Sequence, residues 1–405
     1  MEKEWGKDSL LAGIRMLDLA DEKAGFCSKI LADLGAHVTK VEKPSGDSSR
    51  RIGPFWKNSG HPEESLSFWY DNSNKRGVTL NLESAAGREL FTGFIRKTDV
   101  IVESFPPGYL DGLGLSFEFL SGVNPRIIMV SVTAFGQTGP RNGFRSCDLV
   151  ASALGGQMHV CGSPSLPPIE ACGQQSYLTA SLYAALGVLL ALRKRAKTGK
   201  GVRMDISLQE AVASTLEHVM VRYFHEQHVA RRRGDRHWND FFCILPSKDG
   251  FIHLTPFAEW ETLVDLLESE GKAEDLKDER WKDEAYRGEH FDHVIDVLGK
   301  WTKAHKVDEL FRLGQLMRFP WAPIRSPNEI LSCPQLKARK FFITIEHPVL
   351  GSVLTYPGLP YRFSRRYSMP HKRAPLLGED NVRVYREELG LSHEEFETLS
   401  GKGII

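Results

Sequence analysis

Two stretches of this sequence combine side chains that could bind a metal ion or an anion. His225 and His228 flank Glu226, but the zinc motif of metalloproteases needs its histidines four residues apart on one helix face, and these are three apart. Arginines fill most of the stretch 231–236, where they could clamp a phosphate or a nucleic acid. We interpret the histidines as the end of a surface helix and the arginines as a solvated loop or an interface patch, and binding of an anionic cofactor there stays open.

Other familiar catalytic motifs are missing. The sequence has no Gly-x-Ser-x-Gly elbow and no Walker loop, so serine hydrolases and P-loop nucleotidases have no support. The turn after the first expected strand, residues 18–25, lacks the Gly-x-Gly-x-x-Gly that lets backbone amides approach a pyrophosphate, so we do not expect nicotinamide or flavin binding. The glycines within 135–140 follow a buried strand, which is where open parallel sheets place ligand-binding loops.

The elements that must position these loops are clearest in the first third of the chain. Residues 14–19 and 38–42 have strand patterns, and 24–34 between them repeats apolar residues at helical spacing, with Gly35 at the expected C-cap. The alternation of strand and helix continues to residue 132. It predicts an α/β fold whose large domain is Rossmann-like, with a parallel sheet and helices on both faces.

The second half of the chain has a different pattern. We expect a long amphipathic helix over 176–197, an edge or half-exposed strand over 202–208 and a helix over 209–229. The composition then becomes richer in charge and tryptophan, which is typical of a second, smaller domain. The tail returns to helix over 381–388 and 393–399.

Composition excludes several classes of protein. The 405 residues carry 52 Lys and Arg against 52 Asp and Glu, so the basic excess typical of a protein that wraps nucleic acid is absent. The six cysteines contain no Cys-x-x-Cys pair, which argues against a disulfide framework or a cysteine zinc site and favours a reducing cytosol. The charged N-terminus does not resemble a secretory signal, and no apolar run approaches the roughly 18 residues of a membrane span. We therefore expect a cytoplasmic protein without nucleic-acid or membrane partners.

Seven stretches along the chain together resemble the family III coenzyme A transferases, which include formyl-CoA:oxalate, carnitine and benzylsuccinate CoA-transferases and the related 2-methylacyl-CoA racemases. They follow the family's order: 11–18 (LAGIRMLD), 34–44 (LGAHVTKVEKP), 74–82 (NKRGVTLNL), 107–115 (PGYLDGLGL), 135–140 (FGQTGP), 197–201 (KTGKG) and 374–379 (APLLGE). The resemblance implies a large Rossmann-like CoA-binding domain made of residues 1–205 and 330–405. A linker helix, 206–229, would lead to an inserted small α+β domain, 230–329, and two subunits would interlock like chain links.

The resemblance also implies where coenzyme A would lie along the large domain. The family's CoA-contacting positions fall on Lys23, Ala24, Lys43, Leu80, Ser104, Phe105, Leu113 and Arg145. Cations at Lys43 and Arg145 suit the phosphates of CoA, because ammonium and guanidinium groups both bind phosphate well; the alternative is that both are ordinary surface cations. The sequence departs from the family's pattern at 104–106, where many members begin with asparagine, and at Gly112, where some have arginine.

The catalytic aspartate of these transferases has no counterpart here. In the family that aspartate attacks the acyl-CoA thioester to give a mixed anhydride, and the CoA thiolate then leaves an aspartyl-CoA thioester for the acceptor carboxylate to resolve. Counting back without gaps from 198–201, the aspartate position falls on Tyr177, and residues 171–181 contain no acid. A tyrosine with a pKa of about 10 is a poor substitute for a carboxylate. Glu170, the nearest carboxylate, would require a different register.

The racemase branch of the family also lacks its catalytic groups in this chain. Its His-Asp dipeptide corresponds to Cys147-Asp148, and its second catalytic aspartate coincides with Tyr177. Of the racemase residues, only a glutamate that assists catalysis has a counterpart, Glu259. A proton-shuttling pair needs groups that titrate near the working pH, so this branch is a weaker match.

Our main hypothesis is a CoA-transferase subunit that lacks the aspartate and works with a homologous aspartate-bearing subunit in a heterodimer or heterotetramer. Such an enzyme would move CoA from a donor such as succinyl-CoA to an acid such as benzylsuccinate, with CoA thioesters as substrates, no separate cofactor and no metal. The alternatives are a CoA-ester racemase or isomerase that uses Glu259, Cys147 or Asp148, and a CoA-ester binding protein. Aromatic residues of the small domain could form an acceptor surface or simply its core: Trp238, Phe241, Phe242, Trp260 and Trp281.

Overall fold

The computed structural model describes residues 8–237, 242–365, 367 and 369–405, which divide into two units. The first unit contains the described residues up to Gln157 together with Glu170–Glu217 and Ala338–Ile405, and the second contains Met158–Ile169 and His218–Lys337. The second unit therefore takes in a short segment, Met158–Ile169, that the expected boundaries assign to the large domain.

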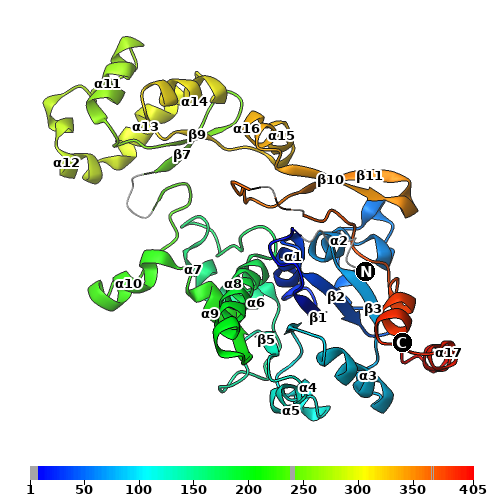
Figure 1. Cartoon of the computed structure of the whole chain (residues 1–405). Coiled ribbons are helices and arrows are strands. Elements are labelled where there is room, and N and C mark those ends of the chain that lie inside the picture. The colour runs from blue at the N-terminus through cyan, green and yellow to red at the C-terminus, as the bar shows by residue number, and fades with distance from the viewer. Residues whose placement is uncertain (1–7, 238–241, 366, 368) are drawn as a thin grey trace. The chain divides into compact units, whose positions relative to one another are not determined.

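A six-stranded parallel sheet forms the centre of the first unit (Figure 1). Its strands are β1 (Arg15–Leu19), β2 (His37–Glu42), β3 (Arg76–Thr79), β4 (Val100–Glu103), β5 (Ile128–Thr133) and β6 (Val202–Ser207). The strand order β3-β2-β1-β4-β5-β6 is that of a doubly wound Rossmann sheet, so the predicted α/β class is confirmed. β6 lies at one edge, as the alternation of its sequence predicts.

Helices cover both faces of this sheet. On one face α1 (Gly25–Asp33) and α8 (Gln175–Thr198) pack on the apolar side chains of the central strands. On the other face lie α3 (Ala85–Ile95), α5 (Phe117–Val123) and two C-terminal helices, η6 (Val382–Glu388) and α17 (His393–Gly401). The remaining helices of this unit are α2 (Leu66–Asn72), α4 (Tyr109–Gly112), α6 (Asp148–Leu154) and α9 (Leu208–Ala213), with short helical turns at Ser48–Arg51, Trp56–Asn58, Pro62–Glu64 and Pro348–Leu350.

The C-terminal tail completes the edge of the sheet at β3. The Asp380 carboxylate accepts the Gly77 N–H at 2.8 Å, and the Asn381 side chain accepts the Thr79 N–H at 2.9 Å. The Tyr385 hydroxyl donates to the Thr79 carbonyl at 2.6 Å. These bonds satisfy backbone groups that an edge strand would otherwise expose, so the tail belongs to the first unit.

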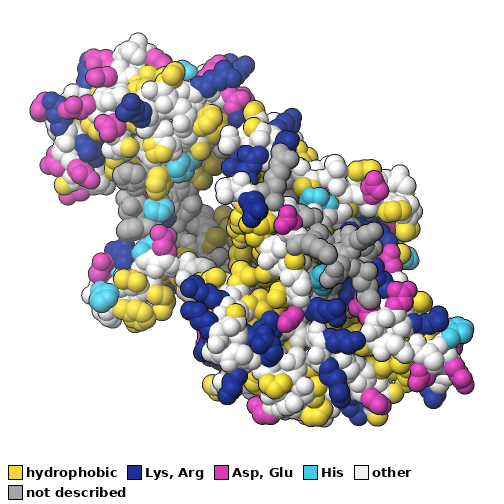
Figure 2. Space-filling view, viewed as in Figure 1, with side chains coloured by type: hydrophobic (Ala, Val, Ile, Leu, Met, Phe, Trp, Pro, Cys, Tyr) yellow, Lys and Arg dark blue, Asp and Glu magenta, His cyan; other side chains and the backbone are white. Residues whose placement is uncertain are grey.

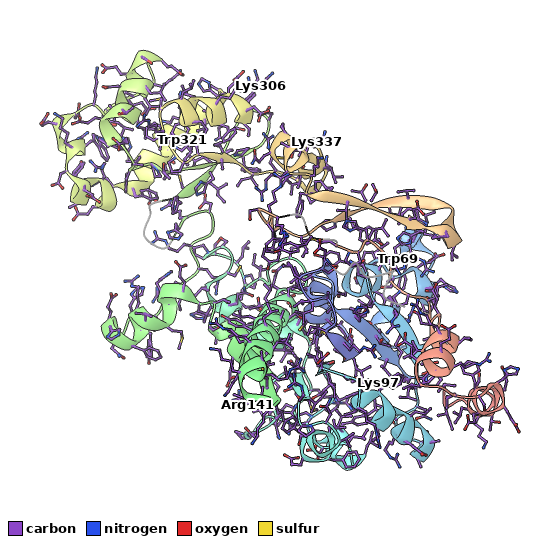
Figure 3. The ribbon with its side chains drawn as sticks, viewed as in Figure 1. Trp69, Lys97, Arg141, Lys306, Trp321 and Lys337 are labelled. Atoms are coloured by element: carbon purple, nitrogen blue, oxygen red, sulfur yellow. The ribbon has the colours of Figure 1, made fainter. Side chains whose placement is uncertain are left out.

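A two-stranded hairpin, β10 (Phe342–His347) with β11 (Ser352–Pro357), packs against α2 of the same unit. The Trp69 ring lies 4.7 Å from the ring of His347 between these elements (Figure 3). The hairpin is thus held by an aromatic contact.

By length and composition, α8 could cross a membrane, and it is the one such helix within the described ranges. Its face formed by Ala180, Ala184 and Val188 is fully buried against the sheet and α1, and core helices of globular domains meet the same two criteria. The opposite face of α8 is apolar and exposed, a feature considered below.

The second unit has its own small sheet and core. Its strands β7 (Cys243–Pro246), β8 (Phe251–Leu254) and β9 (Ala322–Pro323) are antiparallel, with helices α11 (Trp260–Ser269), α12 (Glu284–Glu289), α13 (Phe291–Thr302), α14 (Val307–Leu316), α15 (Pro327–Ser332) and α16 (Pro334–Ala338) and a helical turn at Glu279–Lys282. Trp281, Trp301 and Trp321 are buried in one apolar cluster, and Figure 3 marks Trp321 within it.

One expectation for the second half of the chain requires correction, and one open alternative is decided for two residues. The helix expected over 209–229 is two helices, α9 and α10 (Glu217–Glu226), because the Ser214 and Thr215 hydroxyls donate back to preceding carbonyls and Glu217 has a left-handed backbone, with φ of 40°. Of the aromatic residues expected in the small domain, Trp260 and Trp281 belong to the core and Phe242 is half-buried. Trp238 and Phe241 lie outside the described residues.

Candidate functional site

A cleft of about 1050 Å³ opens at the carboxyl ends of β1 to β5 in the first unit. Each of these five strands is followed by a loop that contributes to its lining, which is the usual place for ligands in an open parallel sheet. Its lining includes Asp21, Lys23, Lys43, Asp47, Leu80, Ser104, Phe105, Tyr109, Phe144 and Arg145. The volume suits a ligand of cofactor size.

The structure brings six of the eight expected CoA-contacting residues to this cleft: Lys23, Lys43, Leu80, Ser104, Phe105 and Arg145. The other two do not line it. Ala24 is fully buried in the core beneath α1, and Leu113 is half-buried in the cluster on the opposite face of the sheet. These two positions support the loops rather than face the cleft.

Two cations of the cleft are free to bind an anion. Lys43 and Arg145 are both exposed, and among the described residues neither forms an ion pair with a carboxylate. Lys23 differs, because its ammonium group pairs with the Asp21 carboxylate. Phosphate groups are therefore attracted chiefly by Lys43 and Arg145.

Hydrogen bonds replace glycines in the first turn of the fold. The Ser104 hydroxyl donates to the Asp21 carboxylate at 2.7 Å and accepts the Asp21 N–H at 2.9 Å, which ties the loop after β1 to the loop after β4. The Asp18 carboxylate accepts the Ala20 N–H at 3.0 Å. Ser104 thus links two loops of the cleft wall to each other.

Aromatic side chains form another part of the wall. The rings of Phe105 and Tyr109 lie 4.6 Å apart, and Phe144, on the loop after β5, is 61% exposed. Apolar faces of this kind can accept a planar ring or an alkyl chain. Tyr109 lies in 107–115, one of the stretches that resemble the family, whereas no sequence pattern indicates that Phe144 lines the cleft.

Tyr177 lies in the first turn of α8 and is buried, with 6% of its surface exposed. Its N–H donates to the Asp148 carboxylate at 3.0 Å, and the Ser176 hydroxyl donates to the Asp148 carbonyl at 3.1 Å. Burial, and then nearby carboxylates led by Glu22 and Asp21, raise the pKa of the Tyr177 hydroxyl above its ordinary value. The phenol is therefore neutral at physiological pH and cannot replace an ionised aspartate.

Two carboxylates, Asp148 and Glu170, lie near the start of the helix that carries this tyrosine. Asp148 acts as a cap for α8, a role that the sequence did not reveal, because a carboxylate at a helix N-terminus satisfies free N–H groups. Glu170 lies in the loop before α8, where burial, and then hydrogen bonding and repulsion from Asp148, raise its pKa. Neither stands on the helix at the position of the family's nucleophile.

The remaining candidates from the racemase interpretation are separated in the structure. Cys147 is an exposed free thiol beside Asp148 in the first unit. Glu259 is exposed in the second unit, where it precedes α11 with a left-handed backbone at φ 48°. Glu259 therefore belongs to a different unit from Cys147 and Asp148, which are neighbours in the sequence.

The histidine and arginine stretches have structural roles in the second unit. α10 ends at Glu226, so His228 lies beyond the helix on which His225 stands, and the described residues contain no cluster of three or more metal-ligating side chains. Arg232 donates to the Ser163 carbonyl at 3.2 Å, and Arg236 pairs with Asp292 at 2.6 Å. These arginines fasten the segments of the second unit to one another.

Comparison with known proteins agrees with this architecture. The model of CoA-transferase family III matches residues 11–381. The chain is 36% identical to the succinyl-CoA:(R)-benzylsuccinate CoA-transferase subunit BbsE of Thauera aromatica, over 96% of this chain and 97% of that one. It is 32% identical to the succinyl-CoA:L-malate CoA-transferase beta subunit of Chloroflexus aurantiacus, over 98% of each. The solved structure of a CAIB/BAIF family protein from Brucella suis superposes with a TM-score of 0.83 at 30% identity, covering 95% of this chain and all of that one.

Proposed function

Because this chain belongs to CoA-transferase family III, we propose that it is the subunit of a heteromeric CoA-transferase that binds CoA esters but lacks the nucleophilic aspartate. The observation that carries the proposal is Tyr177, a buried neutral phenol at the position where the family resemblance implies the nucleophilic aspartate. The proposed reaction moves CoA from succinyl-CoA to an organic acid such as benzylsuccinate. The names of the two relatives, both subunits of succinyl-CoA-dependent transferases, support this assignment.

In this proposal the cleft of the first unit holds the CoA portion of the ester. Lys43 and Arg145 supply positive charge to the phosphates, while Phe105 and Tyr109 provide apolar contact surface. The partner subunit supplies the aspartate that attacks the thioester carbon, so that the acyl group passes to the carboxylate and the CoA thiolate is released for the next step. Binding and nucleophilic attack are thus divided between two homologous chains.

The exposed face of α8 supports association with such a partner. Leu182, Leu186, Leu189 and Leu190 are 52%, 54%, 37% and 57% exposed, and their spacing places them on one side of the helix. Part of this apolar surface is visible over α8 in Figure 2. A continuous apolar helix face on the surface of a subunit marks a protein interface, and a homologous subunit interlocked with this one would cover it.

Native mass spectrometry of the protein purified from its source cells tests the proposal. We expect this chain in a complex with a homologous chain that carries the aspartate, and transferase activity only in the complex. A homodimer of this chain with transferase activity of its own would contradict the proposal. If the isolated chain instead exchanges the α-hydrogen of a branched acyl-CoA in deuterated water, the racemase alternative replaces it.

Two variants test the contact surface directly. Glutamates in place of Leu186 and Leu190 should prevent assembly while leaving the circular dichroism spectrum unchanged, because both side chains are exposed in the isolated subunit. The matched control is Leu316→Glu in the second unit, where the leucine is 84% exposed and lies on a different helix. The control should assemble normally.

A further inference from the structure

A buried lysine on β2 is bonded to two of the loops that line the cleft. Lys40 stands opposite Asp18 in the register of β1 and β2, and its side chain is 1% exposed. Its ammonium group donates to the carbonyl of Ala20, in the turn that carries Asp21. It also lies 3.3 Å from the carboxylate of Asp47, which lines the cleft on the loop after β2. The Lys40 side chain therefore connects the loop after β1 to the loop after β2.

The two loops have local bonds of their own, but the bonds to Lys40 join them. In the loop after β1, the Ala20 N–H donates to the Asp18 carboxylate at 3.0 Å. In the loop after β2, the Asp47 carboxylate accepts the Ser49 N–H at 2.8 Å, and the Asp47 N–H donates to the Glu42 carboxylate at 3.0 Å. The loops share one further hydrogen bond, which is exposed: the Ser48 hydroxyl donates to the Glu22 carboxylate at 3.3 Å. Loss of the ammonium group would therefore remove the buried bonds between the loops and leave only this exposed one among the described contacts.

The charge of Lys40 is retained although the side chain is buried. Burial by itself lowers the pKa of the ammonium group, but nearby carboxylates, led by Asp47 and Asp18, raise it by more, so the net pKa lies above the ordinary value. A charged donor forms stronger hydrogen bonds than a neutral one, particularly where water is excluded. The link between the loops is consequently a strong one.

We propose that Lys40 is a positioning residue of the CoA-ester site, which holds the loop after β1 and the loop after β2 at the spacing that the ligand requires. The proposal rests on the function proposed above, because it assumes that the cleft receives a CoA ester. It assigns Lys40 no contact with the ligand. Its effect is preorganisation: loops that are already in place lose less conformational entropy when the ligand binds.

Two measurements on the full chain test this role. One is isothermal titration calorimetry with coenzyme A and with succinyl-CoA, and the other is hydrogen exchange. Lys40→Met should weaken binding roughly tenfold, because the loops must be ordered by the ligand itself. Lys40→Arg, which keeps a charged donor, should restore most of the affinity. The matched control is Lys29→Met: Lys29 is 6% exposed and pairs with Asp33, but it does not line or underlie the cleft.

Hydrogen exchange measures the amide exchange rates of the two loops, which the loss of a lysine with no link to them would not change. In Lys40→Met without ligand, peptides covering 19–24 and 43–49 should both exchange faster, whereas Lys29→Met should leave both unchanged. If Lys40→Met does not fold, Asp47→Asn removes the charge partner and keeps an acceptor for Ser49, and it should also accelerate exchange in both peptides. Wild-type affinity and unchanged exchange in folded Lys40→Met would overturn the proposal. Failure of the wild-type chain to bind either ligand would instead overturn the proposed function, and exchange would still test the link.

Discussion

The cleft and the surroundings of Tyr177 lie in the same unit and differ in what they retain. The cleft has unpaired cations, apolar rings and loops tied by short hydrogen bonds. Around Tyr177 the polar groups serve the structure instead: Asp148 caps α8, and the phenol is buried against the core. The cleft has exposed cations and apolar rings, whereas position 177 has a neutral phenol and no carboxylate.

Under the proposed function, covalent catalysis is lost from this chain while ligand binding is retained. The cleft is built by loops at the ends of five strands, so its shape depends on the whole sheet. Under the same proposal the nucleophile is a single side chain on the first turn of α8, and its replacement by Tyr177 leaves the sheet intact. A heteromer makes such a replacement tolerable, because a second chain can supply the missing group.

The largest expected effect is the change in the free energy of unfolding when Tyr177 is replaced. Tyr177→Ala should lower the free energy of unfolding by about 3–5 kcal/mol, because it removes a buried aromatic ring from the core. Tyr177→Phe should cost less than about 1 kcal/mol, because no hydrogen bond of the Tyr177 hydroxyl is present among the described residues. Urea denaturation measures both changes. If Tyr177→Phe abolishes activity of the assembled enzyme, the phenol takes part in the chemistry and the contrast between the two regions fails.

A smaller effect concerns Glu103, the last residue of β4, whose carboxylate accepts the Phe105 N–H at 2.8 Å. Burial raises its pKa from 4.5 to about 7, although the hydrogen bond from the Phe105 N–H and the charge of Arg203 oppose the shift. The folded state therefore holds a proton that the unfolded state releases, and stability should fall as the pH rises from about 4.5 to about 7.

The loss attributable to Glu103 is about 3 kcal/mol over this range. Glu103→Gln keeps the acceptor for Phe105 and should remove this part of the pH dependence, as measured by urea denaturation at several pH values. An identical slope in the wild type and in Glu103→Gln would show that the carboxyl does not carry the proton. The pH dependence of stability would then have to come from other groups.

The smallest effect concerns the two exposed cations. Lys43→Ala and Arg145→Ala should each weaken CoA binding by about 1–2 kcal/mol, roughly a tenfold loss, without changing the melting temperature. Calorimetry at two salt concentrations checks the prediction, because a phosphate contact weakens as salt rises. Lys97→Ala is the control, since Lys97 is exposed but does not line the cleft (Figure 3). Equal losses in all three variants would indicate a general charge effect.

Much of the fold could be predicted because it is encoded locally. The periodicity of 14–42 gives strand, helix and strand, and the alternation of 202–208 gives an edge strand, since side-chain direction follows backbone geometry within a few residues. The break between α9 and α10 was missed because it depends on hydroxyl groups bonding back to the helix, which the apolar pattern does not record.

The candidate site was predictable only through resemblance, and then in part. Six of the eight expected residues line the cleft, whereas Ala24 and Leu113 lie at the ends of helices α1 and α4 and are packed in the core clusters. Phe144 and Asp47 entered the cleft without a sequence signal. Their positions depend on how loops after different strands approach one another.

The sequence by itself determined the order of strands and helices, the charge balance and the absence of an acid at position 177, because each is a property of a residue or of a short pattern. Only the tertiary structure decided that this tyrosine is buried, that Asp148 caps its helix and that Lys40 joins two loops. These facts require segments distant in the chain to be packed together, and burial then fixes their charges and hydrogen-bond partners.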